Sequence, residues 1–400
     1  MSSHLRRRDF LNTTSKRLAL ASAAGILPIA SAAPQNKNTA GVDTVTGRRR
    51  GVGLIAVDHQ RSAGGYTLFT PQTDDGNVYL IDIDGAIAHR WKMPNRPGRH
   101  AVLLPSGNLG YNGSHPNSPT LYPMWSIWHG GAFAEVTPSG KTVWEFEDVT
   151  HHHDAEWLAN GNLLYGAAEP LPKNIANLVA GGTTDTVYGD VVKEVNRKGE
   201  LVWKWSAADH LKPSDFPINP LFERVHWPLI NGLWETRQGL ILMSLRTTSG
   251  IIAVDKKSGS VVYHIGAETI SHQHSPMELA NGNILVFDNG NYRAGVSTSY
   301  TRIVEINPAT KAIEWQYADT PHSSFYCPFM GNAQRLWNGN THITDAASGR
   351  LFEVTSKGDV VWEYVIPFFG EYPGIARQFQ PGAQNTTFRS YRYSKEQVRL

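Results

Sequence analysis

Three consecutive histidines, His151, His152 and His153, stand at the start of a run that reads as a β-strand. A second group, His272-Gln273-His274, precedes another apolar run. Imidazole titrates near neutral pH, can attack an electrophile and can bind a metal ion. These residue types predict a site for nucleophilic, acid–base or metal chemistry, provided that the fold brings the two groups together.

The elements around these histidines are short strands. No long segment has a 3.6-residue apolar period, whereas short runs rich in Val, Ile, Trp and Tyr alternate with turn residues. A Gly-x-x-Val-Trp-type segment recurs at residues 140–144, 199–203, 259–263 and 358–362, with looser copies at 85–91 and 310–315. A Gly-Asn turn between apolar residues recurs at 103–109, 157–163, 279–284 and 336–341, with a degenerate copy at 233–241.

This repeat predicts the fold. A unit of roughly 40 to 55 residues with several short strands cannot bury both faces of its sheet alone, so the units must stack side by side. Six copies predict an all-β fold, a six-bladed β-propeller with long capping loops, over residues 53–400. Residues 65–70 are expected to form the first inner strand and residues 378–393 to close the ring. The stretches 167–190 and 206–224 are long enough to cap a site.

The repeat register places histidines at the propeller axis. Residues two apart in a strand share a face, and the innermost strand of a blade starts beside the axis. Histidines from separate blades are therefore expected to line one axial pocket, which His100 and His226 could also reach. The positions eight residues before the glycine of each Gly-Asn turn are Arg99, His153, Asn231, His274 and Gly331, and those ten residues before it are Pro97, His151, Leu229, His272 and Phe329.

Composition narrows the partners. The 400-residue chain has a net charge of +2 and no Lys/Arg run interleaved with aromatic residues, which favours a small-molecule or glycan partner over nucleic acid. Cys327 is the single cysteine, so no intrachain disulfide can form, and it is expected to be a small buried residue. Trp125, Trp128 and Trp227 lie outside the repeat motif and could line an aromatic subsite.

The N-terminal residues have the pattern of an export signal. Arg7-Arg8 precedes a weakly apolar run that ends in Ala30-Ser31-Ala32, which predicts a twin-arginine-type signal peptide over residues 1–33. A flexible linker over 34–52 follows. A periplasmic or secreted protein is expected, without a stable membrane anchor after signal cleavage, because the apolar run is short and rich in Ala and Ser.

Four segments of the chain resemble the bacterial arylsulfate sulfotransferase family. They are His151-His152-His153-Asp154-Ala155-Glu156-Trp157-Leu158, Met243-Ser244-Leu245-Arg246, His272-Gln273-His274 with the sequel 281–290, and Phe388-Arg389-Ser390-Tyr391-Arg392-Tyr393. The resemblance implies a six-bladed propeller that moves a sulfuryl group from a phenolic sulfate to a phenolic acceptor through a sulfated histidine. It implies no cofactor and no nucleotide donor.

The resemblance also implies residue roles. His274 matches the nucleophile, His153 a supporting histidine and Arg246 the arginine that stabilises charge. The family has His-x-Asn where this chain has Leu229-Ile230-Asn231, so one site histidine is missing, and His226 is expected to substitute for it. Ser275 stands where the family has an aspartate. The candidate substrate contacts are His100, His151, His272, Asn231, Trp227 and Tyr326.

Two other functions remain open from the residues. His100, His153, His226 and His274 could hold a divalent metal ion at the axis, as in propeller lyases and oxygenases. A propeller fold by itself implies no activity, so a non-catalytic binder of glycans or aromatic ligands is a further alternative. Metal content separates the first alternative from sulfuryl transfer, and any turnover excludes the second.

Overall fold

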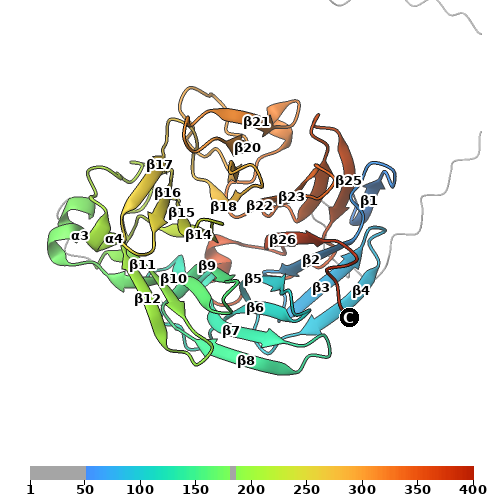
Figure 1. The fold of residues 1–400 in the computed structure, drawn as a ribbon, viewed down its shortest axis with the longest axis horizontal. Helices are drawn as coiled ribbons and strands as arrows, with labels where there is room; N and C mark the ends of the chain where they lie inside the picture. Colours follow the sequence, from blue (N-terminus) through green and yellow to red (C-terminus); the bar gives the residue numbers. More distant parts are fainter. Residues whose placement is uncertain (1–50, 181–185) are drawn as a thin grey trace, which may run out of the picture. The chain divides into compact units, whose positions relative to one another are not determined.

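The computed structural model describes residues 51–180 and 186–400. Within these residues, six antiparallel sheets surround a common axis (Figure 1). The predicted six-bladed β-propeller is thereby confirmed. The proposed signal peptide, 1–33, and nearly all of the proposed linker, 34–52, lie outside the described residues.

Each blade is a sheet of four strands that follow one another from the axis outward. The first two blades along the chain are β5 (Pro97–Leu103), β6 (Leu109–Ser114), β7 (Gly131–Val136), β8 (Thr142–Glu147), and β9 (His151–Trp157), β10 (Leu163–Pro170), β11 (Tyr188–Val195), β12 (Leu201–Ser206). The next two are β14 (Ile230–Glu235), β15 (Leu240–Leu245), β16 (Gly250–Asp255), β17 (Val261–Ile265), and β18 (His274–Glu278), β19 (Ile284–Asp288), β20 (Arg302–Ile306), β21 (Ile313–Tyr317). The last two are β22 (Asn332–Arg335), β23 (Thr341–Asp345), β24 (Arg350–Val354), β25 (Val360–Val365), and the closing blade β26 (Thr387–Tyr393), β2 (Tyr66–Pro71), β3 (Asn77–Asp82), β4 (Ile87–Lys92).

A few elements lie outside this scheme. The short strand β13 (His226–Trp227) pairs in parallel with β11, and β1 (Gly53–Val57) pairs with the outer strand β25. The helices of the described residues are α2 (Trp125–Trp128), α3 (Lys173–Ala180), α4 (Ala207–His210), α5 (Ala376–Phe379) and the 3₁₀ helix η1 (His322–Ser324). Among the described residues, no helix is both long and apolar enough to cross a bilayer.

The ring closes through the C-terminal strand. β26 is the innermost strand of the blade that contains β2, and Tyr66 pairs with Tyr393 at one end of this ladder. The prediction that residues 65–70 form an inner strand is therefore wrong, because the C-terminal segment takes that place and β2 becomes the second strand. Closure in this way leaves no blade without an inner strand.

The repeated tryptophan of the outer strand joins five of the six blades to the next. Trp144 Nε1 donates a hydrogen bond to the Arg197 carbonyl, and Trp203 Nε1 donates to the Lys256 carbonyl. The equivalent tryptophans on β4, β21 and β25 donate to carbonyl groups of Thr137, Ser356 and Ile83. The tryptophan thus supplies both an apolar face and a polar link to the neighbouring blade, and on β17 Tyr263 stands in its place.

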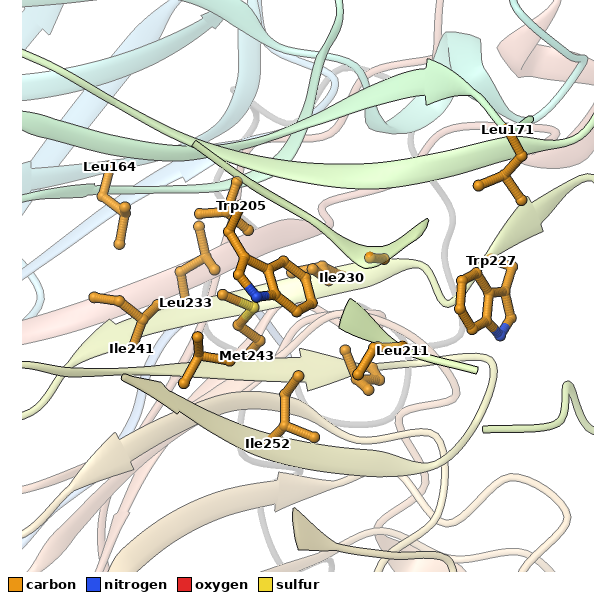
Figure 2. Packing of buried hydrophobic residues seen from close by; sticks show 14 of the residues in the cluster. Leu164, Leu171, Trp205, Leu211, Trp227, Ile230, Leu233, Ile241, Met243 and Ile252 are labelled. Carbon is orange, nitrogen blue, oxygen red and sulfur yellow. The ribbon is translucent and has the colours of Figure 1, made fainter. Parts of the chain in front are cut away.

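Apolar packing between blades makes the inner strands a rigid support. In the cluster drawn in Figure 2, Trp205 packs with Leu233, Met243 and Ile252, which belong to the neighbouring blade. Their fully buried side chains each contribute about 1.5 to 3 kcal/mol to folding. The inner strands are thus held from both sides, which fixes the positions of side chains that face the axis.

Candidate active site

A pocket lies at the starts of the inner strands. Arg99 of β5, His153 of β9 and His274 of β18 line it, together with Arg246, which directly follows β15. Four different blades therefore contribute one cationic or imidazole side chain each. The remaining lining residues are Met124, Ile127, Trp128, Phe329, Met330, Tyr372 and Gln380.

The cover of this pocket comes from segments other than those predicted. Met124, Ile127 and Trp128 lie in or beside α2, between β6 and β7, whereas Tyr372 and Gln380 lie between β25 and β26. The stretches 167–190 and 206–224 contribute no side chain to the lining. Leu211 and Ile218 instead pack into the core shown in Figure 2, because these apolar side chains gain more from burial between blades.

Irregularities in the inner strands select which histidines reach the pocket. The ladder of β9 is irregular between His151 and Ala155, where His153 has a φ of 58°. His272 lies before β18 begins and has a φ of 59°. A bulge interrupts the alternation of side chains along a strand. His151 and His153 therefore do not share a face, contrary to the expectation from regular spacing. His272 and His274 do not share a face either, so only His153 and His274 of these four line the pocket.

The ring of His274 is oriented by two hydrogen bonds. Its Nδ1 lies 2.8 Å from Asn289 Oδ1, and the Asn289 amide nitrogen donates to the Cys327 and Met330 carbonyls at 2.8 and 3.0 Å. Because that amide nitrogen is used as a donor, Oδ1 is the acceptor and His274 carries its proton on Nδ1. Nε2 is then the basic nitrogen, and it accepts the Met330 N–H at 3.2 Å.

The environment keeps His274 neutral. Burial is the main cause that lowers the pKa of His274 well below its ordinary value, and the nearby Arg246 lowers it further, although Asn289 opposes the shift. An imidazole that remains neutral at physiological pH keeps an unprotonated Nε2, and here the electron pair of that nitrogen accepts the Met330 N–H until a substrate takes its place. His274 therefore has the protonation state and the oriented tautomer that a nitrogen nucleophile needs.

Two guanidinium groups of the pocket have no carboxylate partner within residues 51–180 and 186–400. Burial lowers the pKa of Arg99 to about 9 and that of Arg246 to about 10, and the positive charges of other arginines also lower the pKa of Arg99. Arg99 Nε donates to the Trp128 carbonyl, and Arg246 lies over the Trp128 ring at 5.6 Å. Both groups stay charged at neutral pH, and a buried positive charge without a counter-ion favours binding of an anion.

Several predicted site residues lie outside the pocket. His226 contacts Asp190, and His100 lies between the Phe388 and Tyr391 rings. His151 binds Asn112 and the Gly166 carbonyl, and His272 stacks on Phe222 with ring centroids 4.4 Å apart. These four imidazoles satisfy packing or polar contacts within and between blades, so the structure does not bring them to the substrate space.

The other predicted contacts are also placed elsewhere. Asn231 donates to the Gln273 carbonyl and Trp227 Nε1 donates to the Phe216 carbonyl, both in the buried core. Tyr326 is 41% exposed and does not line the pocket. Trp125 is buried and binds Ser118, whereas Trp128 does line the pocket, as one of the three tryptophans suggested for an aromatic subsite.

Sequence reasoning missed three important residues. Asn289 belongs to the resemblance segment 281–290, but nothing in its spacing indicates that it orients His274. Arg99 occupies the same repeat register as His153 and could have been chosen on that basis. Tyr372 lies in a segment without a repeat signal, so only the folded structure places it at the pocket.

The predicted set of metal ligands does not assemble. His100, His153, His226 and His274 form no group with ligand atoms near one another, since they turn toward different partners. Among residues 51–180 and 186–400, one group of three does so: His152, Asp190 and His226 have ligand atoms within 4.8 Å of one another.

The model of the family described as "Arylsulfotransferase (ASST)" matches residues 16–271. A second model, described as "Outer membrane protein assembly factor BamB", matches residues 188–372, in agreement with the repeated sheets. No curated protein sequence matches the chain.

Solved structures with a similar chain trace have low sequence identity. They include a protein of unknown function from Bacteroides caccae, with 16% identity, coverage of 76% of this chain and 94% of that chain, and a TM-score of 0.49. They also include a streptogramin B lyase, with 11% identity, coverage of 80% and 85%, and a TM-score of 0.45. Virginiamycin B lyase from Staphylococcus aureus with quinupristin has 12% identity, coverage of 80% and 76%, and a TM-score of 0.35. These likenesses assign no activity to this chain.

Proposed function

Since the chain belongs to the arylsulfotransferase family, we propose that it transfers a sulfuryl group from an aryl sulfate to a phenolic acceptor in the axial pocket. The observation that carries this proposal is the combination of His274, a neutral imidazole with an oriented Nε2, and two guanidinium groups without carboxylate partners. A nucleophile and an anion site thus line the same pocket.

In the first step, the Nε2 electron pair of His274 attacks the sulfur of the aryl sulfate. A nitrogen–sulfur bond forms, the sulfur–oxygen bond to the aryl group breaks, and the aryl oxygen leaves with the electron pair and takes a proton from water. Nδ1–H of His274 keeps its hydrogen bond to Asn289, which orients the sulfated ring. Covalent catalysis of this kind divides one difficult transfer into two easier ones.

In the second step, the oxygen of an acceptor phenol attacks the same sulfur. The nitrogen–sulfur bond breaks, its electron pair returns to Nε2, and the phenolic proton passes to water. Arg246 and Arg99 are the groups that would bind the sulfuryl oxygens in both steps, because a planar guanidinium donates two parallel hydrogen bonds to an oxyanion. The Met330 N–H, 3.2 Å from Nε2, is placed to donate to a sulfuryl oxygen on that nitrogen.

The apolar part of the pocket suits an aryl group. Trp128, Phe329 and Tyr372 supply ring faces, and Met124 and Met330 supply flexible thioether side chains. Aromatic and methionine side chains bind flat apolar ligands without requiring one fixed shape. We infer no particular aryl sulfate, because these contacts select a class of substrate.

A metal-dependent reaction in this pocket has less support. Only two of its lining side chains, His153 and His274, are of the types that commonly bind transition metals, and no carboxylate lines it. Turnover of a chromogenic aryl sulfate by chelator-treated protein, with and without a phenol, tests the proposal. Acceptor-dependent phenol release supports it, and an absence of turnover would favour the non-catalytic binder.

We also propose export by the twin-arginine route, on the basis of Arg7-Arg8 and the following weakly apolar run. The protein would then act in the periplasm or outside the cell. Sulfuryl transfer without a nucleotide donor suits such a location, since the reaction as proposed needs only the aryl sulfate and the phenol.

A further inference from the structure

A buried group of His152, Asp190 and His226 lies apart from the axial pocket. His152 belongs to β9 and Asp190 to β11, whereas His226 begins β13, which pairs in parallel with β11. Nε2 of His152 lies 3.0 Å from Asp190 Oδ1, and Nε2 of His226 lies 3.2 Å from the same oxygen. All three side chains are at most 1% exposed.

The two Nε2 atoms lie close to this oxygen but are not aligned for well-directed hydrogen bonds to it. Each is a buried nitrogen without a hydrogen-bond partner among the described residues, despite its short distance to Asp190. A ring nitrogen at 3.0 Å fails to bond only when its in-plane axis points beside the oxygen. Because all three ligand atoms also lie within 4.8 Å of one another, the two imidazoles and the carboxylate are close enough to share one ion.

The other nitrogen of each ring is held by a neighbour. Nδ1 of His226 lies 2.6 Å from the Tyr122 hydroxyl, and Nδ1 of His152 lies 2.9 Å from Nδ1 of His153. Asp190 accepts the backbone N–H groups of Leu229 and Ile230 at 2.7 and 3.0 Å. Outer contacts of this kind orient the ligands of a metal site and fix the imidazole tautomers.

The charge of Asp190 has no arginine or lysine to balance it. Two other buried aspartates have cationic partners: Asp154 binds Arg389, and Asp288 binds Arg293 and Arg302. Among the described residues, the ion-pair partners of Asp190 are two histidines. A bound cation would supply the missing charge.

We propose that His152, Asp190 and His226 bind one divalent transition-metal ion of the zinc type. Two imidazole nitrogens and one carboxylate oxygen are ligands that zinc prefers and that magnesium and calcium do not. Tetrahedral zinc with bonds of about 2.0 to 2.1 Å separates neighbouring ligand atoms by about 3.3 Å, close to the two measured separations. The ion would join three strands of one blade and leave one position for water.

The ion would also fix the proton of His153. With a metal on Nε2, His152 keeps its proton on Nδ1. This N–H then donates a hydrogen bond to Nδ1 of His153. His153 then carries its own proton on Nε2 and presents a donor to the pocket that it lines. This consequence rests on the proposed function, in which such a donor would bind a sulfuryl oxygen, whereas the metal site itself does not.

Cobalt binding to the untagged protein tests the site without any substrate. The protein is treated with chelator, equilibrated with Co²⁺ both in the native state and during refolding from denaturant, and analysed for metal content and visible absorption. We expect about one ion per chain with the absorption of tetrahedral cobalt. His226→Gln should remove both signals, while the matched control His342→Gln, a buried histidine on β23 that binds Ser390, should keep them.

A milder variant provides a second test of the metal site in case His226→Gln does not fold. Tyr122→Phe removes only the hydroxyl that contacts His226, so we expect a folded protein whose affinity for Co²⁺ is about 10- to 100-fold weaker. The proposal is overturned if wild-type protein binds no stoichiometric metal under either condition. It is equally overturned if His226→Gln and Tyr122→Phe bind cobalt as the wild type does. Neither result would affect sulfuryl transfer by His274.

Discussion

Asn289 Oδ1 accepts a hydrogen bond from Nδ1 of His274 at 2.8 Å, and this contact sets which nitrogen of His274 is basic. The family has an aspartate after its nucleophilic histidine, where this chain has Ser275, whose hydroxyl donates to the Gly331 carbonyl. Asn289, which directly follows β19 of the same blade, therefore orients the His274 ring. Ser275, the residue after His274, does not. The difference matters because a neutral amide, unlike a carboxylate, raises the pKa of the imidazole only slightly.

Asn289→Ala tests this orientation. Loss of the acceptor frees the ring to rotate and to change tautomer, so kcat for aryl sulfate should fall about 10²-fold, on the scale of losing one well-placed polar group. Asn307→Ala, which removes a surface amide that contacts Glu314, is the matched control and should leave kcat unchanged. Comparable kcat values for both variants would show that Asn289 does not position His274.

Arg246→Ala tests the anion site. Arg246 follows β15 and lines the pocket without a carboxylate partner, so its removal should leave a folded protein and reduce kcat/KM by about 10²-fold or more. Arg246→Lys should recover only part of this loss, because an ammonium group cannot donate two parallel hydrogen bonds to two oxygens of one sulfuryl group. The control is Arg90→Ala, on the exposed outer strand β4. Equal activity of Arg246→Ala and the control would remove Arg246 from the mechanism.

The pH dependence of the first step follows from the lowered pKa of His274. Burial is the largest cause of the lowered pKa of His274, the positive charges of Arg246, Arg389 and Arg99 add to it, and the hydrogen bond to Asn289 opposes it, so the ring stays neutral. The reactive neutral form is present above the folded pKa and is lost only as the pH falls through that lowered value. The phenol released without acceptor should therefore be constant between about pH 8 and pH 6. A decline centred near 6.5, the ordinary histidine value, would contradict the buried, cation-flanked environment.

Export is tested by the pair of arginines at the N-terminus. Replacement of both Arg7 and Arg8 by Lys keeps the positive charge but removes the twin-arginine pattern, so precursor should accumulate in the cytoplasm. Fractionation and immunoblotting measure the distribution. Arg49→Lys with Arg50→Lys, in the proposed linker, is the control and should be exported normally. Unchanged export of the Arg7/Arg8 variant would show that another route is used.

The fold could be predicted from the sequence because its signals are local and repeated. Each Gly-Asn turn joins the two inner strands of a blade, and each repeated tryptophan sits where one blade donates to the next. His153 and His274 were found from that register. His151 and His272 were misplaced because a strand pattern assumes strict alternation. The ladder of β9 is irregular after His151, and His272 precedes β18 with a positive φ.

The remaining parts of the site depend on contacts between distant segments. Tyr372 reaches the pocket from a stretch without repeats, and Asn289 meets His274 across 15 positions of the chain. His226 was expected at the axis, but the parallel pairing of β13 with β11 turns it toward Asp190. No periodicity in the sequence encodes such pairings, so they become visible only in three dimensions.

The most direct measurement of the central claim is the fate of His274 during a single exposure to donor. Chelator-treated protein is mixed with a chromogenic aryl sulfate without acceptor, quenched at neutral or alkaline pH and examined by peptide mass spectrometry. The mechanism predicts a burst of about one phenol per chain and the added mass of one SO₃ group on His274, lost on acid treatment and on addition of a phenol. His274→Ala should show neither the burst nor the adduct. Steady turnover by His274→Ala, or a burst whose adduct lies on another residue, would contradict the assignment of His274 as the nucleophile.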